Sequence, residues 1–138
     1  DELPQRVFLL SGDLHNSFVI RITDNVWEFA SGPHSSGNHT ISAEGHHPAS
    51  GIFDYGPRPT DIRWSTYVRD DVPGPARRMP HYCVVQVNNV FDNPLEPGAE
   101  RLVAFEHPQI IFQFYDGNTG ELKYAESVST RRKKVSDE

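Results

Sequence analysis

The most constraining feature of this chain is an apolar run, Val-Phe-Leu-Leu at residues 7–10, that leads directly into Ser-Gly-Asp-Leu-His at 11–15. Four large apolar residues bounded by polar ones predict a short strand buried on both faces. Gly12 permits a sharp turn because it has no Cβ. In extended backbone Asp13 and His15 would point the same way and offer an oxygen and a nitrogen to a cation. The pattern predicts a metal-binding strand exit; an ordinary turn capped by Asp13 is the alternative.

Two segments carry a resemblance to a known family. Residues 10–15 (Leu-Ser-Gly-Asp-Leu-His) and 26–33 (Val-Trp-Glu-Phe-Ala-Ser-Gly-Pro) together resemble the C-terminal part of PhoD-like alkaline phosphatases, a branch of the calcineurin-like metallophosphoesterases. Leu14 stands where the family usually has Val, which is a conservative change. The resemblance continues through residues 56–64 and 111–117, so it covers most of the chain.

The resemblance implies a fold, an activity and cofactors. The fold would be the α/β, four-layer αββα sandwich of the metallophosphoesterases, of which this chain is the mostly-β C-terminal half. The activity would be metal-dependent hydrolysis of phosphate mono- or diesters at a two-metal site, with Asp13 and His15 as ligands. The family suggests iron and calcium, and zinc or manganese also suits these ligand types. It further suggests an extracytoplasmic location, periplasmic or secreted.

The family's other metal-ligand motifs lie upstream of its Gly-Asp-x-His motif, and this chain begins only a few residues before that motif. We therefore expect the chain to supply part of a site, to be a poor or inactive catalyst alone, and to associate with a missing N-terminal half. Gly-Asn-His-Thr at residues 37–40 resembles another ligand element. It follows the Ser-Gly-Pro loop and lacks the acid that should come next, so we interpret it as a coincidence.

The chain is expected to form one unit of four parts: strands over about 7–31, a long irregular loop over about 32–80, closing strands over about 81–129, and a basic tail over 130–138. The loop is expected because Gly, Pro, Ser, His and Asn replace any periodic apolar pattern there. Such a long loop is usually functional or held by a partner. The individual strands are predicted at 17–22, 26–30, 82–87, 102–105, 110–115 and 122–128.

Most of the seven histidines lie in or next to this loop. His34 directly follows the Ser-Gly-Pro segment, whose strand end should neighbour Asp13, so His34 is a candidate for protonating a leaving group or binding phosphate. Histidine is also a common polar filler in loops. Four arginines could bind phosphate but are better explained as loop anchors or solvent-facing charges: Arg58, Arg63, Arg77 and Arg78.

The composition limits the remaining function classes. A net charge of −6 argues against a nucleic-acid surface, and no apolar stretch approaches the roughly 18 residues of a membrane span. The single cysteine, Cys83, is expected to be a small buried hydrophobe. The alternative to an enzyme is a non-catalytic β-sandwich module that binds a partner or glycan through the aromatic, His-rich loop. An enzyme should expose Asp13 and His15 beside the Ser-Gly-Pro segment, whereas a module should expose a Trp and Tyr platform.

Overall fold

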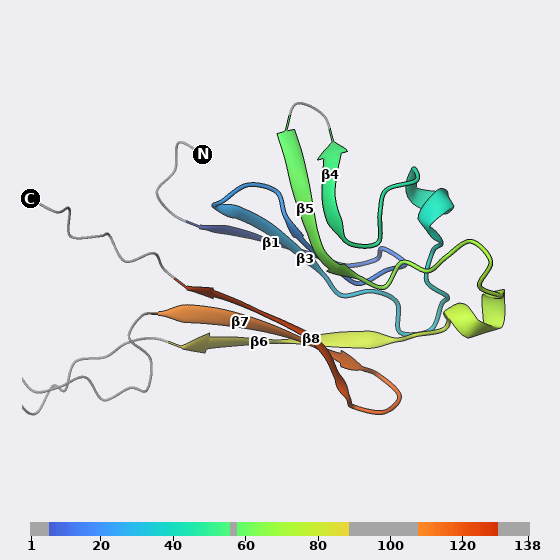
Figure 1. The fold of residues 1–138 in the computed structure, drawn as a ribbon. Coiled ribbons are helices and arrows are strands. Elements are labelled where there is room, and N and C mark those ends of the chain that lie inside the picture. Colours follow the sequence, from blue (N-terminus) through green and yellow to red (C-terminus); the bar gives the residue numbers. More distant parts are fainter. Residues whose placement is uncertain (1–5, 56–57, 89–107, 130–138) are drawn as a thin grey trace, which may run out of the picture.

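Two β-sheets packed face to face form the body of the molecule (Figure 1). The computed structural model describes residues 6–55, 58–88 and 108–129. The first sheet has five strands in the order β1-β3-β2-β5-β4, and the second has three in the order β6-β7-β8. β1 runs parallel to β3, and every other pair of these strands is antiparallel. The strands are β1 (Val7–Ser11), β2 (Phe18–Arg21), β3 (Val26–Ala30), β4 (Gly51–Tyr55), β5 (Arg58–Ser65), β6 (His81–Asn88), β7 (Gln109–Asp116) and β8 (Leu122–Ser129).

The core lies between the two sheets. Alternation along each strand turns one set of side chains toward the facing sheet. Phe29 of β3 and Phe112 of β7 stack across the interface with ring centroids 3.4 Å apart. Burial of each large apolar side chain contributes roughly 1.5–3 kcal/mol. The buried members of this inter-sheet core are Val19, Trp27, Phe29, Phe112, Phe114 and Val128.

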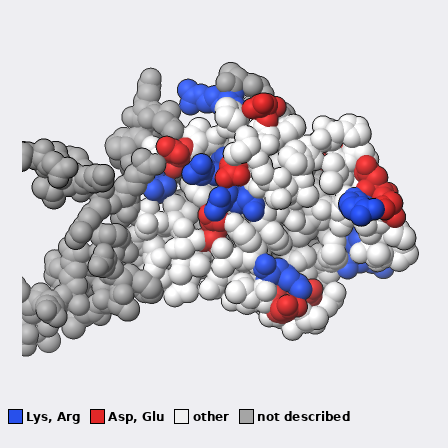
Figure 2. Space-filling view, in the orientation of Figure 1, with Lys and Arg blue, Asp and Glu red and all other residues white. Residues whose placement is uncertain are grey.

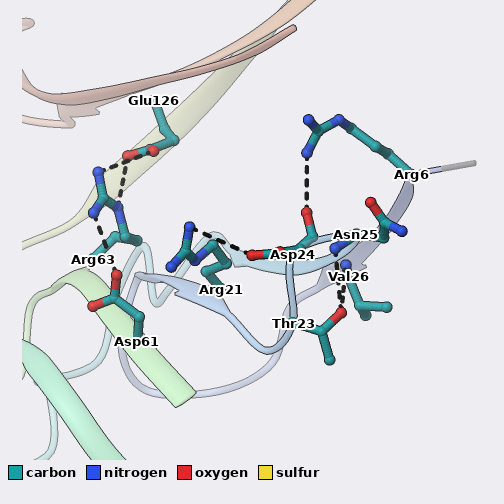
Figure 3. Close-up of polar contacts among 9 residues, drawn as sticks. All are labelled: Arg6, Arg21, Thr23, Asp24, Asn25, Val26, Asp61, Arg63 and Glu126. Atoms are coloured by element: carbon teal, nitrogen blue, oxygen red, sulfur yellow. Dashed lines mark hydrogen bonds and ion pairs between the residues drawn. The ribbon is translucent and has the colours of Figure 1, made fainter. Parts of the chain in front are cut away.

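A β-bulge in β5 directs two consecutive side chains toward the second sheet. The register between β2 and β5 shifts so that Arg63 is the extra residue. Trp64 then stacks on Tyr124 of β8, with centroids 5.4 Å apart. Arg63 lies between Asp61 and Glu126, at 3.3 Å from a carboxylate oxygen of each (Figure 3). This arrangement ties β5 of the first sheet to β8 of the second.

The expected αββα architecture is wrong. The described residues contain no α-helix, only two short 3-10 helices, η1 (Ile41–Glu44) and η2 (Gly74–Arg77), so no helical layer flanks either sheet in that part of the chain. The reason lies in the sequence, which has 11 prolines and 10 glycines and no sustained apolar pattern at helical spacing. This chain is instead mostly β.

The expected irregular loop over residues 32–80 contains a β-hairpin. β4 and β5 lie within it and pair with each other, and β5 extends the first sheet by pairing with β2. The sequence did not predict β5 as a strand, because Pro59 and several charged residues interrupt its apolar positions. Pro59 lies beyond the part of β5 that pairs with β2, so its missing N–H costs that ladder nothing.

β1 is not buried on both faces, contrary to the sequence prediction. Phe8 packs against the core, but Leu9 and Leu10 are 44% and 67% exposed. Both faces of a strand are buried only when a layer covers each of them, whereas β1 lies at the edge of a sheet whose core-facing side alone packs against the second sheet. Two predicted segments, the strand at 102–105 and the basic tail at 130–138, lie outside the described residues.

The surface carries charges of both signs. Figure 2 shows Lys and Arg interspersed with Asp and Glu on one face, over a larger uncharged area. Among the described residues, no helix is long and apolar enough to cross a membrane.

Candidate functional site

The candidate site is the lip loop, residues 12–17, which follows β1. β1 and β3 are parallel and in register through Ser11 and Ala30, so both strands end at the same edge of the sheet. The Ser31 N–H donates to the Ser11 carbonyl at 3.2 Å. The expected proximity of the Ser-Gly-Pro segment (31–33) to the lip loop is therefore confirmed. Carboxyl ends of parallel strands are where ligand sites often form in open sheets.

Asp13 and His15 are both exposed in the lip loop. The backbone here is bent, and Asp13 has a φ of +63°, so the extended geometry assumed from the sequence is absent. No group of three or more His, Cys, Asp or Glu side chains that could hold a metal ion occurs within residues 6–55, 58–88 and 108–129. The assignment of Asp13 and His15 as metal ligands stays a prediction.

The structure brings a second histidine, His39, beside His15. The two imidazole centroids are 4.6 Å apart, with the rings tilted by 44°. The His39 N–H donates to the His15 carbonyl at 3.2 Å. His39 Nδ1 contacts a carboxylate oxygen of Glu44, the last residue of η1. This contact was not predicted, because the Gly-Asn-His-Thr segment (37–40) was interpreted as a coincidence. The Gly-Asn-His pattern was the one sequence signal that could have identified His39.

A buried polar cluster, defined as Asn16, Ser17, Asn38 and Thr66, lies next to these histidines. Its members are at most 7% exposed. Thr66 Oγ1 accepts the Ser17 N–H at 2.9 Å and donates to Asn38 Oδ1 at 3.2 Å. Buried polar groups are costly unless they are hydrogen-bonded. These bonds therefore fix three chain segments that are far apart in the sequence.

Asn16 of this cluster links the two histidine backbones. In the amide orientation that gives both of its polar atoms a partner, Nδ2 donates to the His15 carbonyl at 3.0 Å and Oδ1 accepts the His39 N–H at 3.3 Å. Asn38 is anchored in turn, since its N–H donates to the Arg77 carbonyl at 2.8 Å and its Nδ2 to the Met79 carbonyl at 3.3 Å. The positions of His15 and His39 are thus set by buried bonds.

Gly32 allows the Ser-Gly-Pro segment to approach the lip loop closely. Its N–H donates to Ser17 Oγ at 2.8 Å. A Cβ at this position would lie 2.5 Å from the Asn16 carbonyl carbon and 2.6 Å from the Ser17 nitrogen. Both are backbone atoms, so only glycine fits without a shift of the loop.

An apolar cavity of about 450 Å³ opens on the face of the first sheet that is turned away from the core. Leu14 of the lip loop and Glu44 line it, so the cavity reaches the histidine pair. Phe18 and Ile62 form part of its wall. Tyr67 also lines it, and burial raises the pKa of this phenol above its usual value.

The remaining candidates lie away from this pair. His34 is exposed, and no hydrogen bond or ring contact joins it to the described residues of the lip loop; its role stays a prediction. Arg63 is held by its two carboxylate partners, and Arg77 Nε donates to the Val72 carbonyl at 2.9 Å. Burial raises the pKa of Cys83 to about 11, so this half-buried thiol is protonated near neutral pH.

The two tryptophans do not form an exposed platform. Trp27 is buried in the inter-sheet core, and Trp64 is half-buried against Tyr124.

Comparisons of the chain with protein-family models, with curated proteins and with solved structures found no match. The resemblance to PhoD-like phosphatases therefore remains an expectation from the sequence.

Proposed function

We propose that this chain supplies part of a two-metal site for the hydrolysis of phosphate mono- or diesters, with Asp13 and His15 as ligands. The observation that carries the proposal is the position of these residues. Both are exposed where β1 and β3 end together, beside the Ser-Gly-Pro segment. The half-buried and buried tryptophans leave the aromatic platform of a binding module without support.

The donor types suit a cation, because a carboxylate and an imidazole stand exposed on one loop whose backbone is fixed by the buried polar cluster. When bound, the cations supply Lewis-acid polarisation of the phosphoryl oxygens and activate a water for attack. The contribution of this chain is to hold its donors in place without reorganisation. The described residues hold no group of three or more such donors, so a complete site needs further ligands beyond Asp13 and His15.

The open edges of both sheets support a partner of this kind. β1 exposes Leu9 and Leu10, and β6 exposes Val84, Val85 and Val87. Leu10 and Val85 line the same hollow of about 150 Å³, so the two edges lie on one side of the molecule. Edge strands with exposed apolar side chains are templates for pairing with another chain. We propose that the N-terminal half of the enzyme binds at this side and completes the metal site.

Metal content tests the proposal. The full chain is incubated with Zn²⁺ or Mn²⁺, freed of unbound metal, and measured by elemental mass spectrometry. The wild type should retain metal that the Asp13→Ala/His15→Ala variant loses. A matched control, Asp54→Ala/His46→Ala, removes an exposed aspartate and an exposed histidine outside the lip loop and should behave as wild type. Equal retention by all three proteins would contradict the proposal.

The apolar cavity favours a second candidate, a module that binds an apolar ligand without catalysis. Its polar lining includes the carboxylates of Glu28 and Glu44, which disfavour an anionic ligand. A neutral fluorescent probe such as N-phenyl-1-naphthylamine should then bind saturably to the wild type and not to Ile20→Trp, which fills the cavity. Probe binding together with no metal retention would favour the module over the enzyme.

A further inference from the structure

We propose that His39 is a metal ligand at the lip loop, binding the same cation as His15, and that Glu44 is its positioning residue. This inference rests on the proposed function and extends it, because Asp13 and His15 were the only ligands expected from the sequence. It identifies the Gly-Asn-His segment as functional.

The contact between the two rings is the first reason. Their centroids are 4.6 Å apart, and their backbones are joined directly by a hydrogen bond. In the described part of the chain, neither ring nitrogen of His15 has a hydrogen-bond partner. Two imidazoles on one cation each place a nitrogen about 2.0–2.1 Å from it. The two rings are already in contact, so rotation of the side chains alone, without movement of either backbone, is the change that a shared cation requires.

The second reason is the carboxylate on the far side of His39. An ionised carboxylate can only accept hydrogen bonds, so a neutral His39 ring paired with Glu44 carries its proton on Nδ1 and keeps its lone pair on Nε2. A carboxylate on the non-binding nitrogen is the usual partner of a metal-binding histidine, since it fixes the tautomer and the ring orientation. The His39 side chain is 39% exposed, so a cation can reach it.

The other described histidines lack this combination. His47 packs edge-on against Tyr67, with centroids 4.4 Å apart, and its Nδ1 lies 2.9 Å from the Pro48 carbonyl. His81 is buried and its Nδ1 is 2.8 Å from the Met79 carbonyl. Among the described histidines, His15 and His39 are the only two whose rings contact each other.

The donor types indicate which cation would bind. Imidazole nitrogen suits Zn²⁺ and its transition-metal neighbours, whereas Ca²⁺ and Mg²⁺ prefer oxygen ligands. Two protein nitrogens leave coordination positions open for water or a phosphate oxygen, as catalytic sites require. The buried bonds from Asn16 hold both histidine backbones, so little reorganisation opposes binding.

Imidazole NMR of the wild-type chain tests the inference without any substitution. Long-range ¹H–¹⁵N spectra are recorded during a Zn²⁺ titration. His39 should be in the Nδ1–H tautomer before metal is added, and resonances of His39 Nε2 and one His15 nitrogen should shift with one saturation curve, while His46 is unaffected. A shift of His15 without His39 would overturn the inference and leave the proposed function standing. No shift of either histidine would overturn both.

Matched variants measure the same effect as an affinity. His39→Ala should weaken Zn²⁺ binding at least about 100-fold and Glu44→Gln about 10-fold, the range typical for partners of metal-bound histidines. His46→Asn, which changes an exposed histidine at a positive φ where asparagine is tolerated, should bind as wild type. The His39 backbone bonds survive in these variants, and thermal melts check that each is folded. Wild-type affinity in His39→Ala would refute the inference, even if Asp13→Ala/His15→Ala loses metal.

Discussion

The inter-sheet core and the buried polar cluster hold this molecule together in different ways. The core is a layer of apolar side chains, among them Phe29 and Phe112, whose burial is favourable in many arrangements. The cluster consists of polar side chains, such as Asn16 and Thr66, each with particular partners. The core makes the two sheets pack, and the cluster determines where His15 and His39 lie. Stability and site geometry are therefore separable by mutation.

Phe112→Ala is expected to have the largest effect on stability. Phe112 is fully buried and stacks on Phe29, so its truncation leaves a cavity and should lower the free energy of unfolding by about 3–5 kcal/mol. Chemical denaturation measures this loss. The variant molecules that remain folded should bind Zn²⁺ as the wild type does. Weaker Zn²⁺ binding by the folded fraction would break the separation between core and cluster.

Gly32→Ala should be nearly as destabilising, for the opposite reason. The added Cβ would lie 2.5 Å from the Asn16 backbone, and overpacking of this kind costs about 3 kcal/mol. Unlike the core variant, it should also move the lip loop and weaken Zn²⁺ binding. Gly74→Ala is the control, because a Cβ there meets nothing within 4 Å. If Gly32→Ala and Gly74→Ala melt alike, the close approach at Gly32 is wrong.

Thr66→Val tests one hydrogen-bonded position of the cluster at nearly constant shape. Loss of the hydroxyl leaves the Ser17 N–H and the Asn38 amide oxygen without a partner and should cost about 2 kcal/mol. Thr66→Ser keeps the hydroxyl and should cost less, as judged by thermal or urea unfolding. The reverse order would show that the Thr66 methyl group, and not its hydrogen bonds, is important here.

The reaction rate of the Cys83 thiol reports how well the core is shielded from solvent at its open edge. This prediction involves no substitution and no change in stability. Burial raises its pKa from 9.0 to about 11, and a raised thiol pKa lowers the thiolate fraction at every pH below it. At pH 8, iodoacetamide should therefore modify Cys83 roughly 100-fold more slowly than a thiol of ordinary pKa. The rate should still rise with pH beyond 9. A plateau near pH 9 would indicate that the β1 and β6 edge leaves the thiol solvated.

Local pattern predicted much of this fold. Apolar alternation and turn residues located β2, β3, β6, β7 and β8, while β4 and β5 were missed because Pro59 and the charges of β5 interrupt the pattern. The exposure of Leu10 could not be predicted, since it depends on the position of β1 at the edge of the sheet. The αββα layers came from the resemblance and not from any helical pattern in the chain.

The candidate site was predictable only in part. The spacing of Asp13 and His15 is local and can be read directly. The pairing of His15 with His39 and the hydrogen bond from the His39 N–H to Asn16 join segments more than twenty residues apart. Only the folded arrangement of the loops brings them together, so the Gly-Asn-His segment had no visible partner in the sequence.

Anomalous diffraction from crystals of the chain grown with Zn²⁺ would show whether the lip loop binds metal. A zinc peak is expected about 2.0–2.1 Å from ring nitrogens of His15 and His39, on the exposed side of the lip loop. A well-ordered lip loop with no peak, or zinc bound only at other histidines, would contradict it.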